Sequence, residues 1–178
     1  MSAYNDFAAV YDRLMTDVDY KARTDYLLKL FGKYGKTPTL LLDLACGTGG
    51  FSNQMAKKGI EVIGVDMSED MLGIARENSA EEGTDVLFLC QKAEELDLYG
   101  TVDAAVSSLD SINYLDGSEA LDATLSRLKF FINPRGLFLF DVNTEYKFRT
   151  IDGECFMRDG EDDVCIWRAA YDEEEKRC

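Results

Sequence analysis

Apolar side chains recur every three or four positions along the first 37 residues of the chain. They are Phe7, Val10, Tyr11, Leu14 and Met15, followed by Tyr26, Leu27, Leu30 and Phe31. This spacing places the apolar side chains on one side of a helix. The pattern therefore predicts two amphipathic helices before Pro38.

The pattern then changes to short runs that are apolar at consecutive positions. These runs occupy residues 39–45, 61–66, 85–90, 102–108 and 136–142. Such runs are typical of strands buried on both faces, as in a parallel sheet that helices cover on both sides. Helices are predicted between them at about 49–58, after the capping residue Ser68, and at about 118–131, with a turn at Asn133–Gly136. We therefore expect five buried strands in an α/β fold, an open, doubly wound, mostly parallel sheet with helices on both faces.

The last 33 residues follow a different pattern. Two strand-like runs flank an Asp159-Gly160 turn and predict an antiparallel hairpin. Ten acidic and four basic residues lie from Asp152 onward, which favours a solvated appendage. We divide the chain into helices at 1–37, a sheet core at 38–145 and an acidic antiparallel appendage at 146–178.

Composition narrows the choice of partners. The 178-residue chain has a formal net charge of −15, which repels polyanions and disfavours nucleic acid as a partner. It has no histidine, and its five cysteines form no CxxC pair, so we expect neither a metal site nor a disulfide framework. Because no apolar run reaches the length of a membrane span and the N-terminus lacks a signal-peptide pattern, we expect a cytoplasmic protein that does not bind membranes.

The chemistry of the chain begins with the stretch LLLDLACGTGG at residues 40–50. Asp43 lies near the end of the first strand, and the glycines that follow allow a ligand to approach the backbone. Asp66 ends the second strand, where a carboxylate can accept hydrogen bonds from two ribose hydroxyls. The two acids therefore predict an adenosine-like ligand.

The glycine spacing separates two classes of such ligands. A dinucleotide site needs G-x-G-x-x-G, and counting from Gly47 places Ser52 where the third glycine belongs. A diphosphate would also be repelled by Asp43, whereas an amino group or a sulfonium would be attracted. The stretch thus favours a cationic adenosine derivative over a dinucleotide.

Four segments resemble motifs of the class I S-adenosylmethionine-dependent methyltransferases, which have a Rossmann-like fold. They are LLDLACGTGG at 41–50, VIGVDMSEDML at 62–72, VDAAVSSLDSINYL at 102–115 and LKFFINPRGLFLFDVNT at 128–144. The segments occur in the family's order, and the resemblance extends over roughly residues 1–145. It implies that the cofactor is S-adenosylmethionine.

The resemblance also implies roles for individual residues. Those assigned to the cofactor are Tyr11 near the methionine carboxylate, Asp43, Ala45, Cys46 and Gly47 around the methionine part, Asp66 at the ribose, Met67, Ala93 and Glu94 at the adenine, and Asp110 beside the methyl group. The sequence departs from the family pattern at Ala45, where many members have glycine, and at Lys92, where an aspartate is frequent. Asp110 and Tyr114 are the candidates for a catalytic base, with water as the alternative.

Several residues also have a purely structural interpretation. Tyr11 could belong to a packed aromatic stripe, and Asp110 could cap a turn. Cys46 and Cys90 are expected to be small buried apolar residues and not nucleophiles, because no histidine is present to activate a thiolate.

The resemblance therefore implies a methyltransferase, and we expect it to act on a small-molecule acceptor. The alternatives are a cofactor-binding or interaction module without turnover and an NAD(P)-dependent oxidoreductase. The family's sheet has two further strands that do not fit after residue 142, so the fifth strand is expected to be an apolar edge. We expect a fragment of a longer protein; the alternatives are a second copy that covers this edge as a homodimer, or the tail folding back on it.

Overall fold

A computed structural model describes residues 8, 11–15, 17–159, 164–174 and 178 of the chain. The elements are α2 (Tyr20–Lys33), β1 (Leu40–Leu44), α3 (Gly50–Lys57), β2 (Glu61–Asp66), α4 (Glu69–Glu82), β3 (Val86–Cys90), η1 (Ala93–Glu95), β4 (Val102–Ser107), η2 (Ser111–Tyr114), α5 (Gly117–Phe131), β5 (Ile132–Phe140), α6 (Glu145–Ile151), β6 (Cys155–Asp159) and β7 (Val164–Arg168). Of the first predicted helix, residues 11–14 are helical, and most of the rest lies outside the described residues. In the described part of the chain, no helix is both long and apolar enough to cross a membrane.

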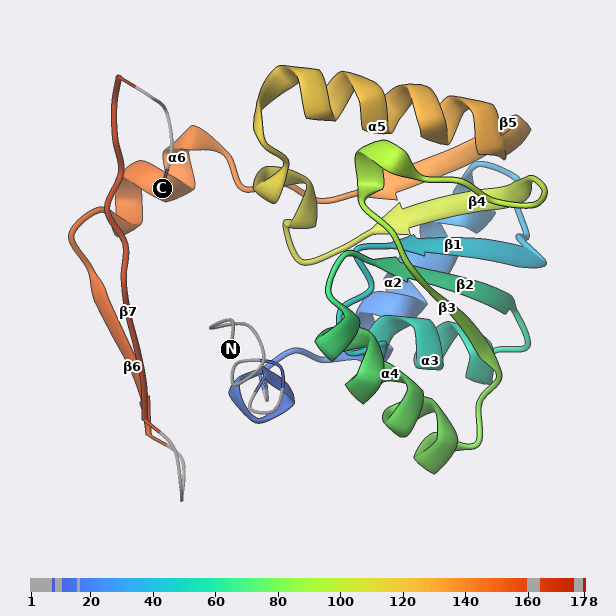
Figure 1. Cartoon of the computed structure of the whole chain (residues 1–178), viewed down its shortest axis with the longest axis horizontal. Coiled ribbons are helices and arrows are strands. Elements are labelled where there is room, and N and C mark those ends of the chain that lie inside the picture. The colour runs from blue at the N-terminus through green and yellow to red at the C-terminus, as the bar shows by residue number, and fades with distance from the viewer. Residues whose placement is uncertain (1–7, 9–10, 16, 160–163, 175–177) are drawn as a thin grey trace.

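Five parallel strands form the central sheet in the order β3-β2-β1-β4-β5. The chain builds outward from β1 to β3, returns to β4 beside β1, and continues to β5 (Figure 1). The strand order therefore reverses between β1 and β4, and ligands of open α/β sheets bind at the carboxyl ends of the strands at such a point. The predicted doubly wound α/β fold is confirmed.

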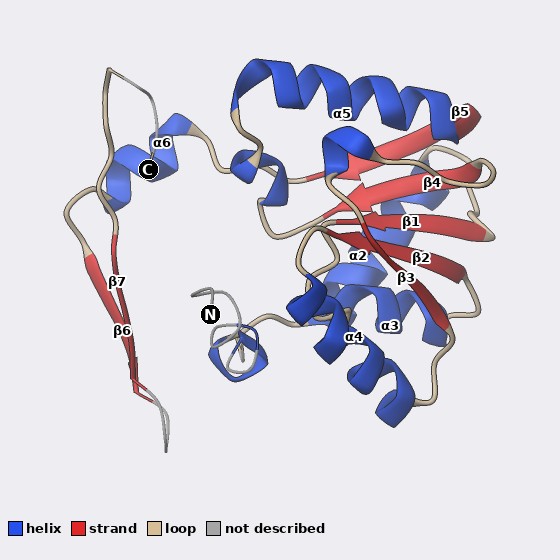
Figure 2. Ribbon diagram, in the orientation of Figure 1, coloured by secondary structure: helices blue, strands red, loops and turns tan. Residues whose placement is uncertain are grey.

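Helices cover both faces of the sheet, with α5 on one face and α2, α3 and α4 on the other (Figure 2). Neighbouring residues of β1 serve opposite faces: Leu41 packs with Phe31 and Phe51, whereas Leu42 packs with Leu128 and Phe131. This alternation explains why the strand is apolar at consecutive positions, since side chains on a strand point alternately to its two faces.

The prediction of five buried strands is wrong for the outer two, whereas the expectation that the fifth strand is an apolar edge is confirmed for the described part of the chain. β3 and β5 are the edge strands, and Leu87 and Phe140 on them are exposed. Cys90, at the end of β3, is exposed as well, so the expectation that it is buried is also wrong. An edge strand has a neighbour on one side only, and the covering helices shield it less than they shield the centre of the sheet.

The turn predicted at Asn133–Gly136 forms a bulge inside β5, which begins four residues earlier than predicted. The register moves from Val102 opposite Ile132 to Ala104 opposite Leu137, so β5 holds more residues than β4 over this stretch. Arg135 has a φ of 65°. Residues 133–136 thus form a local bulge, and the pairing of β5 with β4 resumes after it.

The appendage contains the predicted hairpin, in which β6 and β7 pair antiparallel; its turn lies outside the described residues. Helix α6, which precedes it, was not predicted. Phe156 stacks on Trp167 with ring centroids 5.7 Å apart, and Phe148 stacks on Tyr171 at 6.3 Å. The hairpin stands apart from the sheet, beyond the carboxyl ends of the strands (Figure 1).

Candidate functional site

The carboxyl ends of β1 and β2 meet at Asp66, whose carboxylate receives two backbone hydrogen bonds. Gly47 N donates to Oδ2 at 2.8 Å, and Ser68 N donates to Oδ1 at 2.9 Å. An ionised carboxylate has about four acceptor positions, so about two remain for a ligand after these bonds. The glycine loop and the acid predicted to bind ribose are therefore held together directly.

The loop after β1 takes left-handed backbone at three positions, with φ values of 61° at Ala45, 55° at Gly47 and 77° at Gly49. A Cβ placed on Gly47 would meet no atom within 4 Å, whereas a Cβ on Gly49 would lie 3.1 Å from the Phe88 ring. Gly47 therefore borders open space, whereas Gly49 lacks room for a side chain because it packs against Phe88. Ala45 adopts a conformation that costs a non-glycine residue about 1–2 kcal/mol, so its methyl group is accommodated with strain.

Asp43 is 1% exposed and accepts a hydrogen bond of 2.5 Å from Ser52 Oγ, which joins β1 to α3. Burial, with a smaller contribution from the charge of Asp66, raises the pKa of Asp43 to about 7 against the lowering effect of the Ser52 hydrogen bond. The adjoining Cys46 is buried, and burial raises the pKa of its thiol well above the ordinary value. A thiol with a raised pKa is a poor nucleophile, which agrees with the structural interpretation of Cys46.

The residues predicted to contact adenine follow the carboxyl ends of two neighbouring strands. Met67 comes directly after β2 and is 70% exposed. Ala93 and Glu94 are half-buried in η1, which follows β3. Gln91 N donates to the Asp66 carbonyl at 3.0 Å and so ties the segment after β3 to the end of β2.

Asp110 follows β4 in a left-handed turn, with φ values of 60° at Leu109 and 53° at Asp110. Its side chain makes no capping hydrogen bond to η2, so the structure does not support the turn-cap interpretation. Partial burial raises the pKa of Asp110, the charge of Lys147 lowers it, and Asp141 raises it again. Two successive non-glycine residues at positive φ are a feature that recurs at functional sites.

Asn143, which the sequence did not single out, holds the Asp110 side chain. Its Nδ2 donates to Asp110 Oδ2 at 2.6 Å, and its Oδ1 accepts from Lys147 Nζ at 2.9 Å. The Asn113 side chain accepts from Asn143 N at 2.8 Å and donates to Asn143 O at 3.0 Å. The bonds between residues 113 and 143 connect segments that are 30 residues apart in sequence, which no local pattern would reveal.

The two candidate tyrosines differ in burial. Tyr114 is 82% exposed, whereas Tyr11 is half-buried. Burial raises the pKa of Tyr11, and Asp12, Tyr114, Asp110 and Asp66 raise it further in that order. Tyr11 is therefore the more shielded of the two tyrosines.

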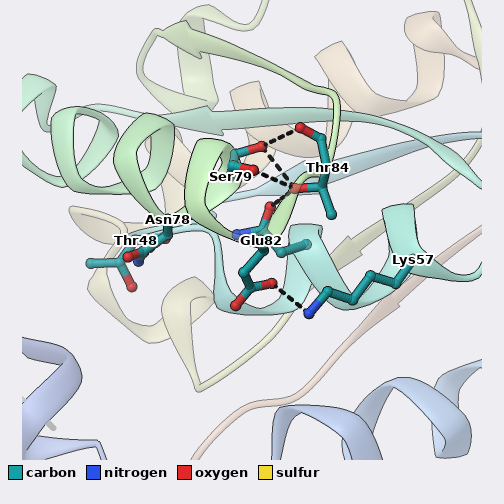
Figure 3. A network of polar contacts seen from close by, with 7 residues as sticks. Thr48, Lys57, Asn78, Ser79, Glu82 and Thr84 are labelled. Carbon is teal, nitrogen blue, oxygen red and sulfur yellow. Dashed lines mark hydrogen bonds and ion pairs between the residues drawn. The ribbon is translucent and has the colours of Figure 1, made fainter.

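A polar network connects α3 and α4 beside the glycine loop that follows β1 (Figure 3). Asn78 Nδ2 donates to the Thr48 carbonyl at 3.1 Å, and Thr84 Oγ1, which follows α4, donates to Asn53 Oδ1 of α3 at 2.6 Å. Lys57 and Glu82 form an ion pair at 2.9 Å between the two helices. The loop therefore rests on two helices that are held together by side chains.

Comparison with known proteins gives a consistent picture. Residues 41–136 match the family described as "Methyltransferase domain". The chain is 34% identical over 168 residues to YqeM of Bacillus subtilis, a protein named as a methyltransferase, covering 93% of this chain and 66% of that one. It is 30% identical over 129 residues to a ubiquinone biosynthesis O-methyltransferase of Sinorhizobium fredii, covering 69% of this chain and 51% of that one.

Among solved structures, an S-adenosylmethionine-dependent methyltransferase from Clostridium acetobutylicum superposes with a TM-score of 0.83 at 29% identity, covering 97% of this chain and 71% of that one. The chain is thus similar to a part of longer proteins, and it spans about two thirds of the length of YqeM.

Proposed function

Because the chain belongs to the class I S-adenosylmethionine-dependent methyltransferase family, we propose that it transfers a methyl group from that cofactor to a small-molecule acceptor. One observation carries the proposal: the Gly47 loop borders open space while its N–H is bonded to Asp66. The acceptor positions left on Asp66 match the two hydroxyls of a ribose. The residues present therefore fit the cofactor.

Each candidate residue has a part in this proposal. Asp66 would accept from the ribose, and the backbone of Ala45, Cys46 and Gly47 would line the methionine part. Asp43 would hold the loop through Ser52, to which it is bonded at 2.5 Å. The remaining cofactor contacts would come from Met67, Ala93 and Glu94 at the adenine and from Tyr11 at the methionine end.

When bound, S-adenosylmethionine supplies an electrophilic methyl group on a positively charged sulfur. The chain must then orient the acceptor, exclude water and take up a proton where the acceptor carries one. Asp110 is the proposed proton acceptor, since it lies at the end of β4, and burial raises its pKa. A carboxylate with a raised pKa takes up a proton more readily. Tyr114, which is exposed nearby in η2, would contact the acceptor.

The names of the relatives support a small-molecule acceptor. One is a ubiquinone biosynthesis O-methyltransferase, and another, from Streptomyces fradiae, is a dTDP-3-amino-3,6-dideoxy-alpha-D-glucopyranose N,N-dimethyltransferase that is 29% identical over 123 residues. The net charge of −15 repels polyanionic acceptors.

We further propose that a second copy of the chain covers the open edge of β5, where Phe140 is exposed.

Ligand binding tests the proposal without knowledge of the acceptor. S-adenosylmethionine and S-adenosylhomocysteine should raise the melting temperature, and NADH should not, because only a ligand of the native state stabilises it. Asp66→Ala should weaken the binding of S-adenosylhomocysteine by about 1–3 kcal/mol in calorimetry, the range for hydrogen bonds to a charged group. Stabilisation by NADH alone would instead favour the oxidoreductase alternative.

Turnover needs a separate measurement. Protein incubated with methyl-labelled S-adenosylmethionine and a fractionated metabolite extract should place the label on a small molecule. Binding without any labelled product would favour the cofactor-binding module that does not turn over.

A further inference from the structure

Asp12, in the N-terminal segment, is hydrogen-bonded to both the glycine loop and α4. Thr48 Oγ1 donates to Asp12 Oδ1 at 2.6 Å across 36 residues of sequence. Asn78 Nδ2 donates to Asp12 Oδ2 at 2.9 Å across 66 residues, and the same amide donates to the Thr48 carbonyl at 3.1 Å. The three residues form a closed polar cluster, in which each carboxylate oxygen of Asp12 has a donor and the backbone carbonyl of Thr48 accepts the third bond.

The partner of Asp12 in the loop is buried. Thr48 lies between Gly47 and Gly49 and is 2% exposed, so its hydroxyl depends on a protein partner. A buried hydroxyl that loses its partner is costly, and a bond to a carboxylate is stronger than one between neutral groups. The contact is therefore more than an exposed surface pair, and it joins the loop to the N-terminal segment.

The neighbour of Asp12 in the chain is Tyr11, which is half-buried. Burial raises the pKa of the Tyr11 hydroxyl, and the charges of Asp12, Asp110 and Asp66 contribute to the same rise. Further along the segment, the Tyr20 ring covers Gly50, since a Cβ built there would lie 2.8 Å from it. The segment thus runs along the carboxyl ends of the strands, and Asp12 is bonded to the loop beside the proposed cofactor site.

We propose that Asp12 is a positioning residue that fastens the N-terminal segment to the glycine loop and so holds its neighbour Tyr11 beside that loop. The inference rests on the proposed function, because the space beside the glycine loop is the proposed S-adenosylmethionine site. The consequence is a coupling between the loop and the segment. A ligand that orders the glycine loop also stabilises the N-terminal segment, and loosening that segment weakens the binding of the ligand by the same factor.

Hydrogen exchange and calorimetry test this coupling with S-adenosylhomocysteine as the probe. In the ligand-free protein, Asp12→Ala and Thr48→Val should speed exchange of the amides of residues 11–15 by about tenfold, the factor equivalent to roughly 1.4 kcal/mol. Both variants should weaken S-adenosylhomocysteine binding by a similar factor. Thr48→Ser keeps the hydroxyl and should behave like the wild type in both measurements.

Two further variants make the test specific. Asp12→Asn keeps the shape and can still accept from Asn78 while donating to the Thr48 hydroxyl, so its effect should be smaller than that of Asp12→Ala. Asp25→Ala is the matched control, because it removes an exposed carboxylate bonded to Lys58 at 2.7 Å, away from the loop. It should change neither the exchange of residues 11–15 nor the affinity.

The possible outcomes are distinct. Unchanged exchange in both Asp12→Ala and Thr48→Val overturns the proposal, and so does faster exchange with unchanged affinity, which would make the contact only structural. A wild-type protein that does not bind S-adenosylhomocysteine defeats the proposed function, and this inference with it. That failure is recognised because it occurs before any substitution is made. If Asp12→Ala does not fold, Thr48→Val and Asp12→Asn still decide the matter.

Discussion

The two halves of the carboxyl edge of the sheet are built in different ways. On the side of β1 and β2, the site consists of backbone N–H groups, positive φ angles and the buried Asp43. On the side of β4 and β5, it consists of side-chain bonds around Asp110 and Asn143, close to an exposed Tyr114. The first half is held by the core, and the second by polar contacts that water can replace. Substitutions should therefore act on stability in the first half and on the arrangement of the site in the second.

The largest expected effect is the pH dependence that Asp43 contributes to stability. Its pKa rises from 3.8 to about 7 on folding, so the native state binds the extra proton between these values. The contribution of Asp43 to the free energy of unfolding should therefore fall as the pH rises from 4 to 7, by up to about 4 kcal/mol. Asp43→Asn should remove this slope, which is measured as the difference between the two proteins in urea unfolding. Parallel curves for the two proteins would contradict the burial of an ionisable Asp43.

The two glycines at positive φ should respond differently to alanine. Gly47→Ala meets no neighbouring atom, so its cost should be limited to the backbone strain of about 1–2 kcal/mol, with a further loss of S-adenosylhomocysteine affinity. Gly49→Ala adds a contact at 3.1 Å with Phe88 and should lower the melting temperature more. Calorimetry measures the affinity of both variants for S-adenosylhomocysteine, and thermal unfolding measures their stability. If the two variants lose the same affinity and the same stability, Gly47 does not border the ligand.

The smallest expected effect on stability lies in the other half. Asn143→Ala removes the 2.6 Å bond to Asp110 and should cost about 1 kcal/mol, since the pair is only partly buried. The pKa of Asp110 should rise further, because the lost bond stabilises its ionised form. Carboxyl-carbon NMR of labelled aspartate measures that pKa directly, and binding of S-adenosylhomocysteine should be unchanged. A fall in the Asp110 pKa would contradict the position given to Asn143.

The sequence predicted the fold where burial imposes a period on the chain. The consecutive apolar positions of β1 and β4 correctly predicted buried strands, and Ser68 marked the start of α4, where its side chain accepts from Met71 N at 3.3 Å. The prediction failed in two respects, although β5 was expected at an edge. β3 and β5 have the composition of buried strands but are partly exposed, and the bulge before Gly136 was taken for a turn outside the strand. Composition alone does not report how many neighbours a strand has.

The same contrast holds for the site. The glycine loop and the acids at positions 43 and 66 were predicted because the chain builds them from a short, continuous stretch and from the end of the next strand. The structure brings Asp66 to Gly47, and it adds Asn143 beside Asp110, which the sequence had not suggested. The individual cofactor contacts and the role of Asp110 stay predictions.

What the sequence by itself determined is the order of strands and helices and the presence of a glycine loop between two acids, because these features are written in neighbouring residues. Only the tertiary structure decided which polar side chains meet, as with Asp12 and Thr48 or Asn143 and Asp110. Those partners lie 36 and 33 residues apart, and their positions show no periodicity, because each polar side chain is chosen for one contact and not for a continuous apolar face.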